Sequence, residues 1–187
     1  TRVDQNSMLG REFTFGRTNF QSNIDAKITD RLKVGVQING RQETRDNPGV
    51  PGGDDYWAPR FALFRNRPTE RPFANDNPAY INNIGHMAEN WGLLTKKNSG
   101  YWTEDWRVLQ TNFIGEYDSP IKGLTAKGTY SYYIADRLMN GHEYTYDAYS
   151  YFPETDEYKV TFANLNPWRE RGTRKILETV LQGQLNY

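Results

Sequence analysis

The sequence predicts an all-β chain, an antiparallel meander of long strands, and three observations support this fold class. Polar and apolar residues alternate over five stretches of about 13–18 residues. Short turns and long irregular segments alternate between these stretches. Six of the nine prolines lie in residues 46–105, where they would interrupt a sheet.

The first two strands are expected at about residues 12–29 and 31–45, joined by a tight turn at Asp30. Because side chains alternate between the two faces of a strand, each of these strands has one apolar and one polar face. The apolar face carries Phe20, Ile24 and Ile28 in the first strand and Val34 and Val36 in the second. The polar face of the first strand carries Arg17, Asn19, Asn23 and Asp25.

Three further strands are expected at about residues 106–118, 123–136 and 173–187. Leu124 and Leu181 belong to their apolar faces, and Lys127 and Gln184 to their polar faces. Two long connections, about 46–105 and 137–171, separate the pairs of strands, and the second contains a hairpin of its own around Pro153. Aromatic residues are expected at both ends of the apolar faces, with Phe13, Phe15, Tyr130 and Tyr132 toward the long connections and Tyr117 and Tyr187 toward the short turns.

The alternation of short and long connections is typical of outer-membrane barrels, which have short periplasmic turns and longer extracellular loops. In this interpretation the apolar faces contact lipid and the polar faces line a lumen. The small residues Ser22 and Ala26 on the apolar face fit a lipid contact better than a closely packed protein core. The alternative is a soluble or surface-attached β-sandwich that binds carbohydrate, with the same apolar faces as its core.

Composition narrows the function classes. The chain has 23 basic and 23 acidic residues, which argues against nucleic acid as a partner. It has no cysteine, its mean hydropathy is −0.87, and no apolar run approaches the roughly 18 residues of a membrane helix. His86 and His142 are far apart in sequence and no nucleophile-and-base motif is present, so we expect no catalytic, cofactor or metal site.

Several segments together resemble the barrel of SusC/RagA-like TonB-dependent transporters. They are FTFGRTNFQSNIDAKITDRLKVGVQINGR, NPGVPGGDDYW, RPFANDNPAY, WRVLQTNFIGEYDSPIKGLTAKGTYSYYIADR, EYTYDAYSYF and NPWRERGTRK, in this order. The resemblance implies a barrel in the class of about 22 strands in the Gram-negative outer membrane. It also implies a plug, a segment that couples to the TonB complex, a SusD-like lipoprotein lid, and import of glycans or peptides without catalysis.

No segment of this sequence is assigned to a plug, so the resemblance implies an internal fragment of the barrel. In such a barrel the lumen-facing candidates are Arg17, Asn19, Asn23, Asp25, Lys127 and Gln184. The lipid-facing candidates are Phe20, Ile24, Ile28, Val34, Val36, Leu124 and Leu181. The candidates for contact with ligand or lid are the aromatic residues of the first long connection, which could instead pack the loop in place. They are Tyr56, Trp57, Trp91, Trp102 and Trp106.

Overall fold

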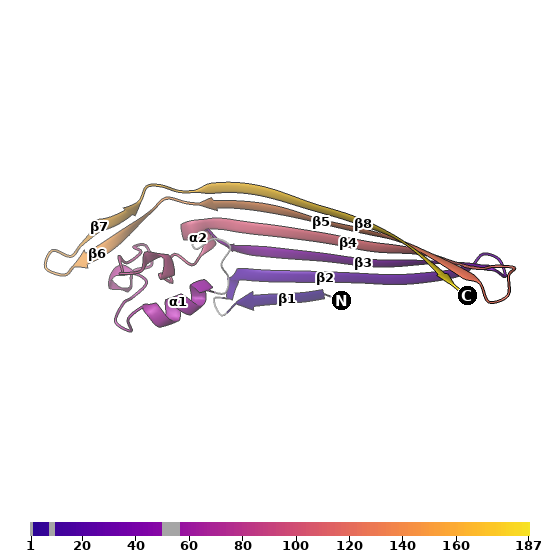
Figure 1. Cartoon of the computed structure of the whole chain (residues 1–187). Coiled ribbons are helices and arrows are strands. Elements are labelled where there is room, and N and C mark those ends of the chain that lie inside the picture. Colours follow the sequence, from indigo (N-terminus) through magenta and orange to yellow (C-terminus); the bar gives the residue numbers. More distant parts are fainter. Residues whose placement is uncertain (1, 8–9, 50–56) are drawn as a thin grey trace.

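The chain is all-β, with few helices, and its main element is one antiparallel sheet of long strands (Figure 1). The computed structural model describes residues 2–7, 10–49 and 57–187. The six strands lie in the order β1-β2-β3-β4-β5-β8. They are β1 (Arg2–Ser7), β2 (Gly10–Lys27), β3 (Leu32–Pro48), β4 (Gly100–Asp118), β5 (Thr125–Glu143) and β8 (Arg169–Asn186).

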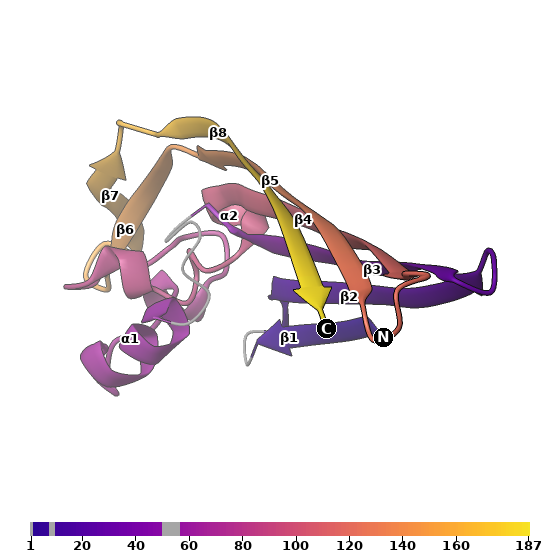
Figure 2. The ribbon, with the colours of Figure 1, turned by 45° about the vertical axis from the view of Figure 1, so that its right-hand side comes forward.

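The smaller elements gather at one end of this sheet, beyond the ends of the long strands (Figure 1). They are α1 (Trp57–Arg65), α2 (Lys96–Ser99), the 3-10 helices η1 (Ala74–Asp76) and η2 (Met87–Glu89), and the hairpin of β6 (Tyr146–Phe152) and β7 (Glu157–Asn164). We call this the loop end. The short turns β2–β3 and β4–β5 lie at the opposite end, the turn end. The strands are twisted relative to one another, so the sheet is not flat (Figure 2).

The expected meander and the hairpin around Pro153 are confirmed, but the strands run further toward the loop end than predicted. β3 continues to Pro48, β4 begins at Gly100 and β5 continues to Glu143. The register shows why: Pro48 pairs with Tyr101, and Gly100 with Glu143, so backbone pairing persists to the loop end. The sequence alternates poorly there because both faces of these extensions are polar or aromatic.

One strand, β1, was not predicted. It pairs with residues 10–18 of β2, from Arg2 opposite Thr18 to Ser7 opposite Gly10. Its six residues contain only one apolar residue, Val3, so period-two alternation could not mark it. β1 reaches β2 at the loop end, so the rule of long connections at this end does not hold for it.

The register aligns the apolar faces of all five long strands on one side of the sheet. Residues directly opposite one another form rows, and five successive rows contain no charged residue and no amide. We call these rows the apolar band. It covers nine residues in each strand: 32–40, 109–117, 126–134 and 177–185, with 20–28 in β2 and its turn. Its central row is Ile24, Val36, Phe113, Tyr130 and Leu181.

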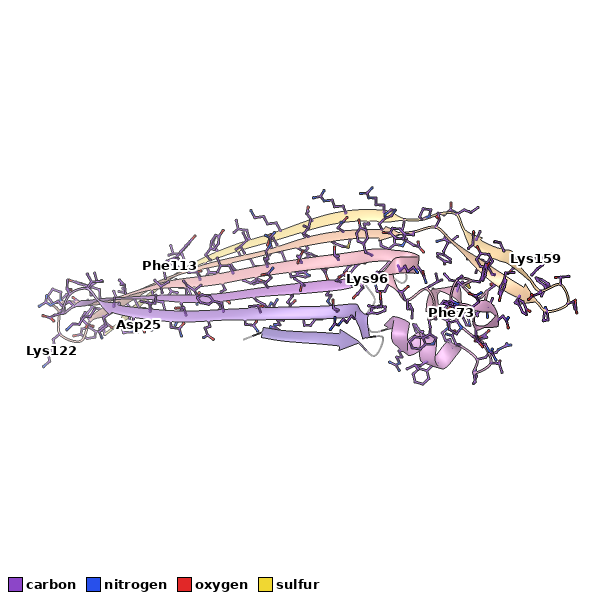
Figure 3. The ribbon with its side chains drawn as sticks, turned by 180° about the vertical axis from the view of Figure 1, so that it is seen from behind. Asp25, Phe73, Lys96, Phe113, Lys122 and Lys159 are labelled. Atoms are coloured by element: carbon purple, nitrogen blue, oxygen red, sulfur yellow. The ribbon has the colours of Figure 1, made fainter. Side chains whose placement is uncertain are left out.

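No described element covers the apolar band. Phe20 is 60% exposed, Ile24 59% and Leu181 81%. Figure 3 shows side chains standing out from both sides of a single sheet, with the helices and the β6–β7 hairpin gathered at the loop end. A β-sandwich needs a second sheet across this face. Among the described residues the only second sheet is β6–β7, which extends beyond the loop end.

The aromatic residues are placed differently from the expectation at one end. Phe13 and Phe15 have the parity of the polar face, and Phe13 is 2% exposed in a small core with Ala62 and Leu94. Tyr130 lies in the central row of the apolar band, because β5 continues well beyond it. Both errors have one cause, namely that the strands extend further toward the loop end than the sequence pattern shows.

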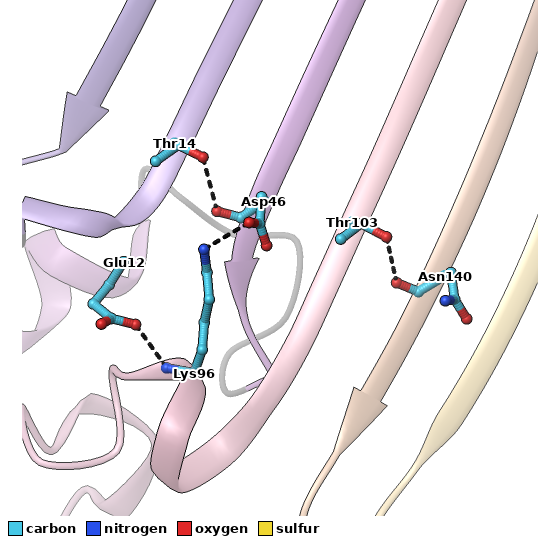
Figure 4. Close-up of polar contacts among 6 residues, drawn as sticks. All are labelled: Glu12, Thr14, Asp46, Lys96, Thr103 and Asn140. Carbon is cyan, nitrogen blue, oxygen red and sulfur yellow. Dashed lines mark hydrogen bonds and ion pairs between the residues drawn. The ribbon is translucent and has the colours of Figure 1, made fainter.

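Hydrogen bonds and an ion pair fasten the loop segment to the sheet next to this core (Figure 4). The Lys96 backbone N–H donates to Glu12 Oε2 over 2.7 Å, and Lys96 Nζ lies 2.7 Å from Asp46 Oδ2. Thr14 Oγ1 donates to the Asp46 carbonyl, and Thr103 Oγ1 to the Asn140 carbonyl. The start of α2 is thereby held against the loop ends of β2 and β3.

Candidate functional site

The lipid-facing candidates lie on the side of the sheet that carries the apolar band. Phe20 pairs with Gly40, and Ile24 with Val36, which fixes β2 and β3 in one register. Ile28 and Leu124 lie outside the regular strands, in the two short turns, where their backbones continue the same parity. Ile28 is 58% exposed. The candidates therefore share one face, as the alternation predicts.

The lumen-facing candidates lie on the opposite side, which we call the polar face. They are Arg17, Asn19, Asn23, Asp25, Lys127 and Gln184. Two cavities open on this face. The one nearer the turn end has a volume of about 460 Å³ and is lined by charged groups from three strands, with Lys127 Nζ 2.9 Å from Glu116 Oε1. The other, about 410 Å³, lies nearer the loop end and is lined mainly by amides.

Arginine is concentrated on the polar face, just beyond the apolar band on its loop-end side. Arg17 Nε and Arg41 Nε each lie 3.5 Å from Glu43 Oε1. Arg137 pairs with the buried Glu104, and its guanidinium carbon lies 5.9 Å from the centre of the Trp106 ring. Arg–carboxylate pairs of this kind are stronger when partly desolvated, as Glu104 is.

The structure disperses the aromatic residues that were candidates for contact with ligand or lid. Tyr56 lies outside the described residues, and Trp57 begins α1. Trp91 packs against the core around Phe13. Trp102 and Trp106 belong to β4 and not to a loop, and Trp102 is 8% exposed. No ligand-binding cluster forms from the members that the structure describes.

Trp102 instead has a structural role, together with a tryptophan from the other long connection. A Cβ atom at Gly141 would meet both the Trp168 ring and the Trp102 ring. Two indoles therefore cover the backbone of β5 at a position where only glycine leaves room. This supports packing, and not ligand contact, as the role of Trp102.

A tyrosine cluster joins the two long connections, and the sequence analysis did not single it out. The Tyr80 ring stacks on Tyr158 with centroids 4.0 Å apart and meets the Tyr149 ring edge-on at 5.0 Å. The Tyr149 backbone N–H donates to the Ile81 carbonyl over 2.7 Å. The signal was available in the alternating tyrosines of the segment YTYDAYSYF, but its partner Tyr80 lies more than 60 residues earlier.

The hairpin carries a pH-dependent contact at its base. Burial raises the pKa of the Glu143 carboxyl above its ordinary value of 4.5, against the opposing effect of the Trp168 backbone N–H and the Asn164 amide. Asn164 Nδ2 donates to Glu143 Oε1 over 3.1 Å. Because the folded chain favours the neutral acid, this stability is complete below the ordinary pKa and is lost as pH rises through the raised pKa.

We therefore expect Glu143→Gln, which stays neutral and still accepts the bond from Asn164, to slow amide hydrogen exchange in β6–β7 at about pH 7. Near pH 3.5 the variant and the parent should exchange equally, because both side chains are then neutral. Exchange that differs as much at the lower pH as at the higher one would argue against titration of Glu143 as the cause.

No described helix has the length and apolar character to span a membrane. Within the described ranges, no three His, Asp or Glu side chains lie close enough together to hold a metal ion. A comparison of the chain with family models, with curated proteins and with solved structures finds no match.

Proposed function

We propose that this chain forms part of the wall of an outer-membrane β-barrel, in a TonB-dependent importer of glycans or peptides that acts with a SusD-like lipoprotein. The observation that carries the proposal is the uncovered apolar band. Five strands present it in register, with a polar face behind it. The role is gated passage of a nutrient, without chemical catalysis.

The height of the band fits a bilayer. About 9–11 strand residues cross the hydrocarbon region, and the band covers nine. Nine residues at about 3.3 Å each, tilted by about 40°, give a height of roughly 20–25 Å, close to the apolar band of outer-membrane barrels. A water-exposed band of this size would be an aggregation hazard.

Charged residues bound the band on both sides. In the next row toward the loop end, Arg107 NH2 lies 2.7 Å from Asp136 Oδ2, with Lys175 opposite Asp136. At the turn end stand Asp30 and Lys122. Charged groups immediately outside a lipid-facing band are expected, because charges inside it are costly.

The edges of the sheet are consistent with a larger closed structure. β1 pairs only with residues 10–18 of β2, so residues 19–27 have no partner on that side among the described residues. β8 likewise pairs only with β5. Unpaired backbone groups cannot face lipid, so a membrane sheet must continue until it closes. The assignment to a TonB-dependent importer, and to its partners, rests on the sequence resemblance.

A cysteine scan tests the membrane interpretation, and the absence of native cysteine makes each labelled site unique. Single cysteines at positions 33–38 of β3 are labelled with an environment-sensitive dye in lipid vesicles. We expect brominated lipid to quench the dye at Val34, Val36 and Ile38 but not at Lys33, Gly35 and Gln37. A label at Lys175, outside the band, should escape quenching.

Uniform quenching along β3, or none, would contradict the proposed function. A folded, monomeric chain in detergent-free buffer with the Val36 label shielded from water would favour the alternative, a soluble carbohydrate-binding β-sandwich. That alternative requires a second sheet over the band, for which the described residues provide no candidate.

A further inference from the structure

The cavity of about 410 Å³ on the polar face is lined by side chains suited to a small polar ligand. We call it the amide pocket. Its volume falls within the range of about 300–1,000 Å³ that is common for small-ligand pockets. All of its strands are interior strands of the described sheet. The residues used below are Gln21, Asn39, Gln110, Arg41, Tyr133 and Val108.

Three amides of the pocket stand side by side but do not bond to one another. Gln21 is directly opposite Asn39, and Asn39 is directly opposite Gln110. None of the three makes a side-chain hydrogen bond within the described part of the chain. One row closer to the turn end the pattern differs, since Asn112 Nδ2 donates to Gln37 Oε1 over 3.2 Å. The amide pocket therefore presents free donors and acceptors together.

Paired donors and acceptors on three neighbouring amides match the vicinal hydroxyls of a sugar, each of which donates and accepts. Tyr133 continues the amide row on β5, and Val108 lies in the adjacent row on β4. An aromatic ring and an apolar floor beside a few polar groups are the usual composition of a small-ligand site. A peptide would use such amides less fully, because its backbone offers no adjacent hydroxyls.

Arg41 adds a requirement for negative charge. Its Nε is buried and has no hydrogen-bond acceptor, although Glu43 Oε1 lies 3.5 Å away. Glu43 is shared, since Arg17 lies at the same distance from the same oxygen. One carboxylate therefore faces two guanidinium groups, and a second carboxylate on Arg41 would complete its hydrogen bonding.

The surroundings of Arg41 carry an excess of positive charge. The three rows centred on that of Arg17 contain five arginines and two glutamates. The arginines are Arg17, Arg41, Arg45, Arg137 and Arg174, and the glutamates are Glu43 and Glu104. The rows on either side of these three add one carboxylate each, Glu170 and Glu178, both on the outer strand β8.

We propose that the amide pocket binds a sugar unit that carries a carboxylate, a uronic acid, with its hydroxyls on the three amides and its carboxylate on Arg41. The inference rests on the proposed function, which places the polar face along a passage for nutrients. It narrows that function to acidic saccharides among the possible cargoes.

The test measures binding by titration calorimetry, with the protein purified in detergent in the form in which the cell makes it. The probes are tetragalacturonate, the neutral galactotetraose and tetraglutamate. We expect tetragalacturonate to bind and Arg41→Gln to weaken it by about tenfold or more, as for the loss of a charge-assisted bond. Gln110→Leu should weaken it as well.

Two further variants guard against a general effect on folding or charge. Arg41→Lys keeps the ion pair with Glu43 and should lose less affinity than Arg41→Gln. Arg174→Gln removes the same charge from the same face outside the pocket and should change affinity less than about twofold. Each variant is checked for unchanged strand content by circular dichroism.

Equal binding of galactotetraose, or full affinity in Arg41→Gln, would overturn the acidic-sugar site. Tetraglutamate that binds as well as the uronate, and is insensitive to Gln110→Leu, would also overturn it in favour of a simple anion site. A protein that passes the cysteine scan but binds no uronate refutes this inference and leaves the proposed function standing. Failure of the cysteine scan removes both.

Discussion

Replacing Ile24 by arginine is expected to destabilise the membrane-inserted protein by about 2–4 kcal/mol and to lower the yield of folded protein in lipid. Ile24 lies in the central row of the apolar band, opposite Val36, and is 59% exposed. A guanidinium at this depth must either lose its hydration or draw water and headgroups into the bilayer. The measurement is guanidinium-induced unfolding in phospholipid vesicles, followed by tryptophan fluorescence.

Asn23→Arg is the matched control, because it introduces the same residue one position earlier in β2 on the polar face. We expect it to change the free energy of unfolding by less than about 0.5 kcal/mol, as surface substitutions usually do. If the two variants lose the same stability, the apolar band does not face lipid. In a β-sandwich Ile24→Arg would also be costly, so the comparison must be made in vesicles and repeated in detergent-free buffer.

Gly100→Ala is expected to cost about 3 kcal/mol or more and to open the loop ends of β4 and β5. Gly100 has a φ of +94°, a conformation that residues with a Cβ rarely adopt. A Cβ here would also collide with the His142 carbonyl oxygen. The estimate combines about 1–3 kcal/mol for the backbone conformation with about 1–3 kcal/mol for the steric conflict.

The resulting loss should be local as well as global. Gly100 pairs with Glu143, and the Tyr144 N–H donates to the Ser99 carbonyl over 3.0 Å. We expect the amides at the loop end of β5 to exchange faster in Gly100→Ala, while those within residues 126–134 stay protected.

Gly123→Ala separates the two causes. Gly123 has a similar φ of +88°, but no atom lies within 4 Å of a Cβ at this position. We expect it to cost only about 1–2 kcal/mol, the price of the left-handed backbone conformation alone. Should Gly123→Ala prove as damaging as Gly100→Ala, the close approach of the His142 carbonyl would not be the reason for glycine at position 100.

The apolar band and the polar face were predictable from the sequence, whereas the loop end was not. Phe20, Ile24 and Val36 lie on one side and Asn23 and Asp25 on the other, as their alternation requires. Beyond the band, both faces of β4 are polar or aromatic, and the pattern that marks a strand disappears although its pairing continues.

The candidate binding groups show the same division. The sequence identifies Asn19 as a polar-face residue by parity alone. It does not show that Gln21, Asn39 and Gln110 are neighbours, since they come from three strands and the third lies 71 residues after the second. Nor does it show that Phe13 leaves the aromatic residues of the apolar face and packs under Ala62.

The physical reason is the range of the interactions involved. Which face a side chain takes depends on its own strand, because backbone geometry reverses the direction at every residue. The fold class and the chemistry of both faces therefore follow from the sequence alone. The alignment of the rows, the place where each strand ends and the docking of the long connections depend on pairing and packing between distant segments. Those features, and with them the amide pocket, exist only once the strands are side by side.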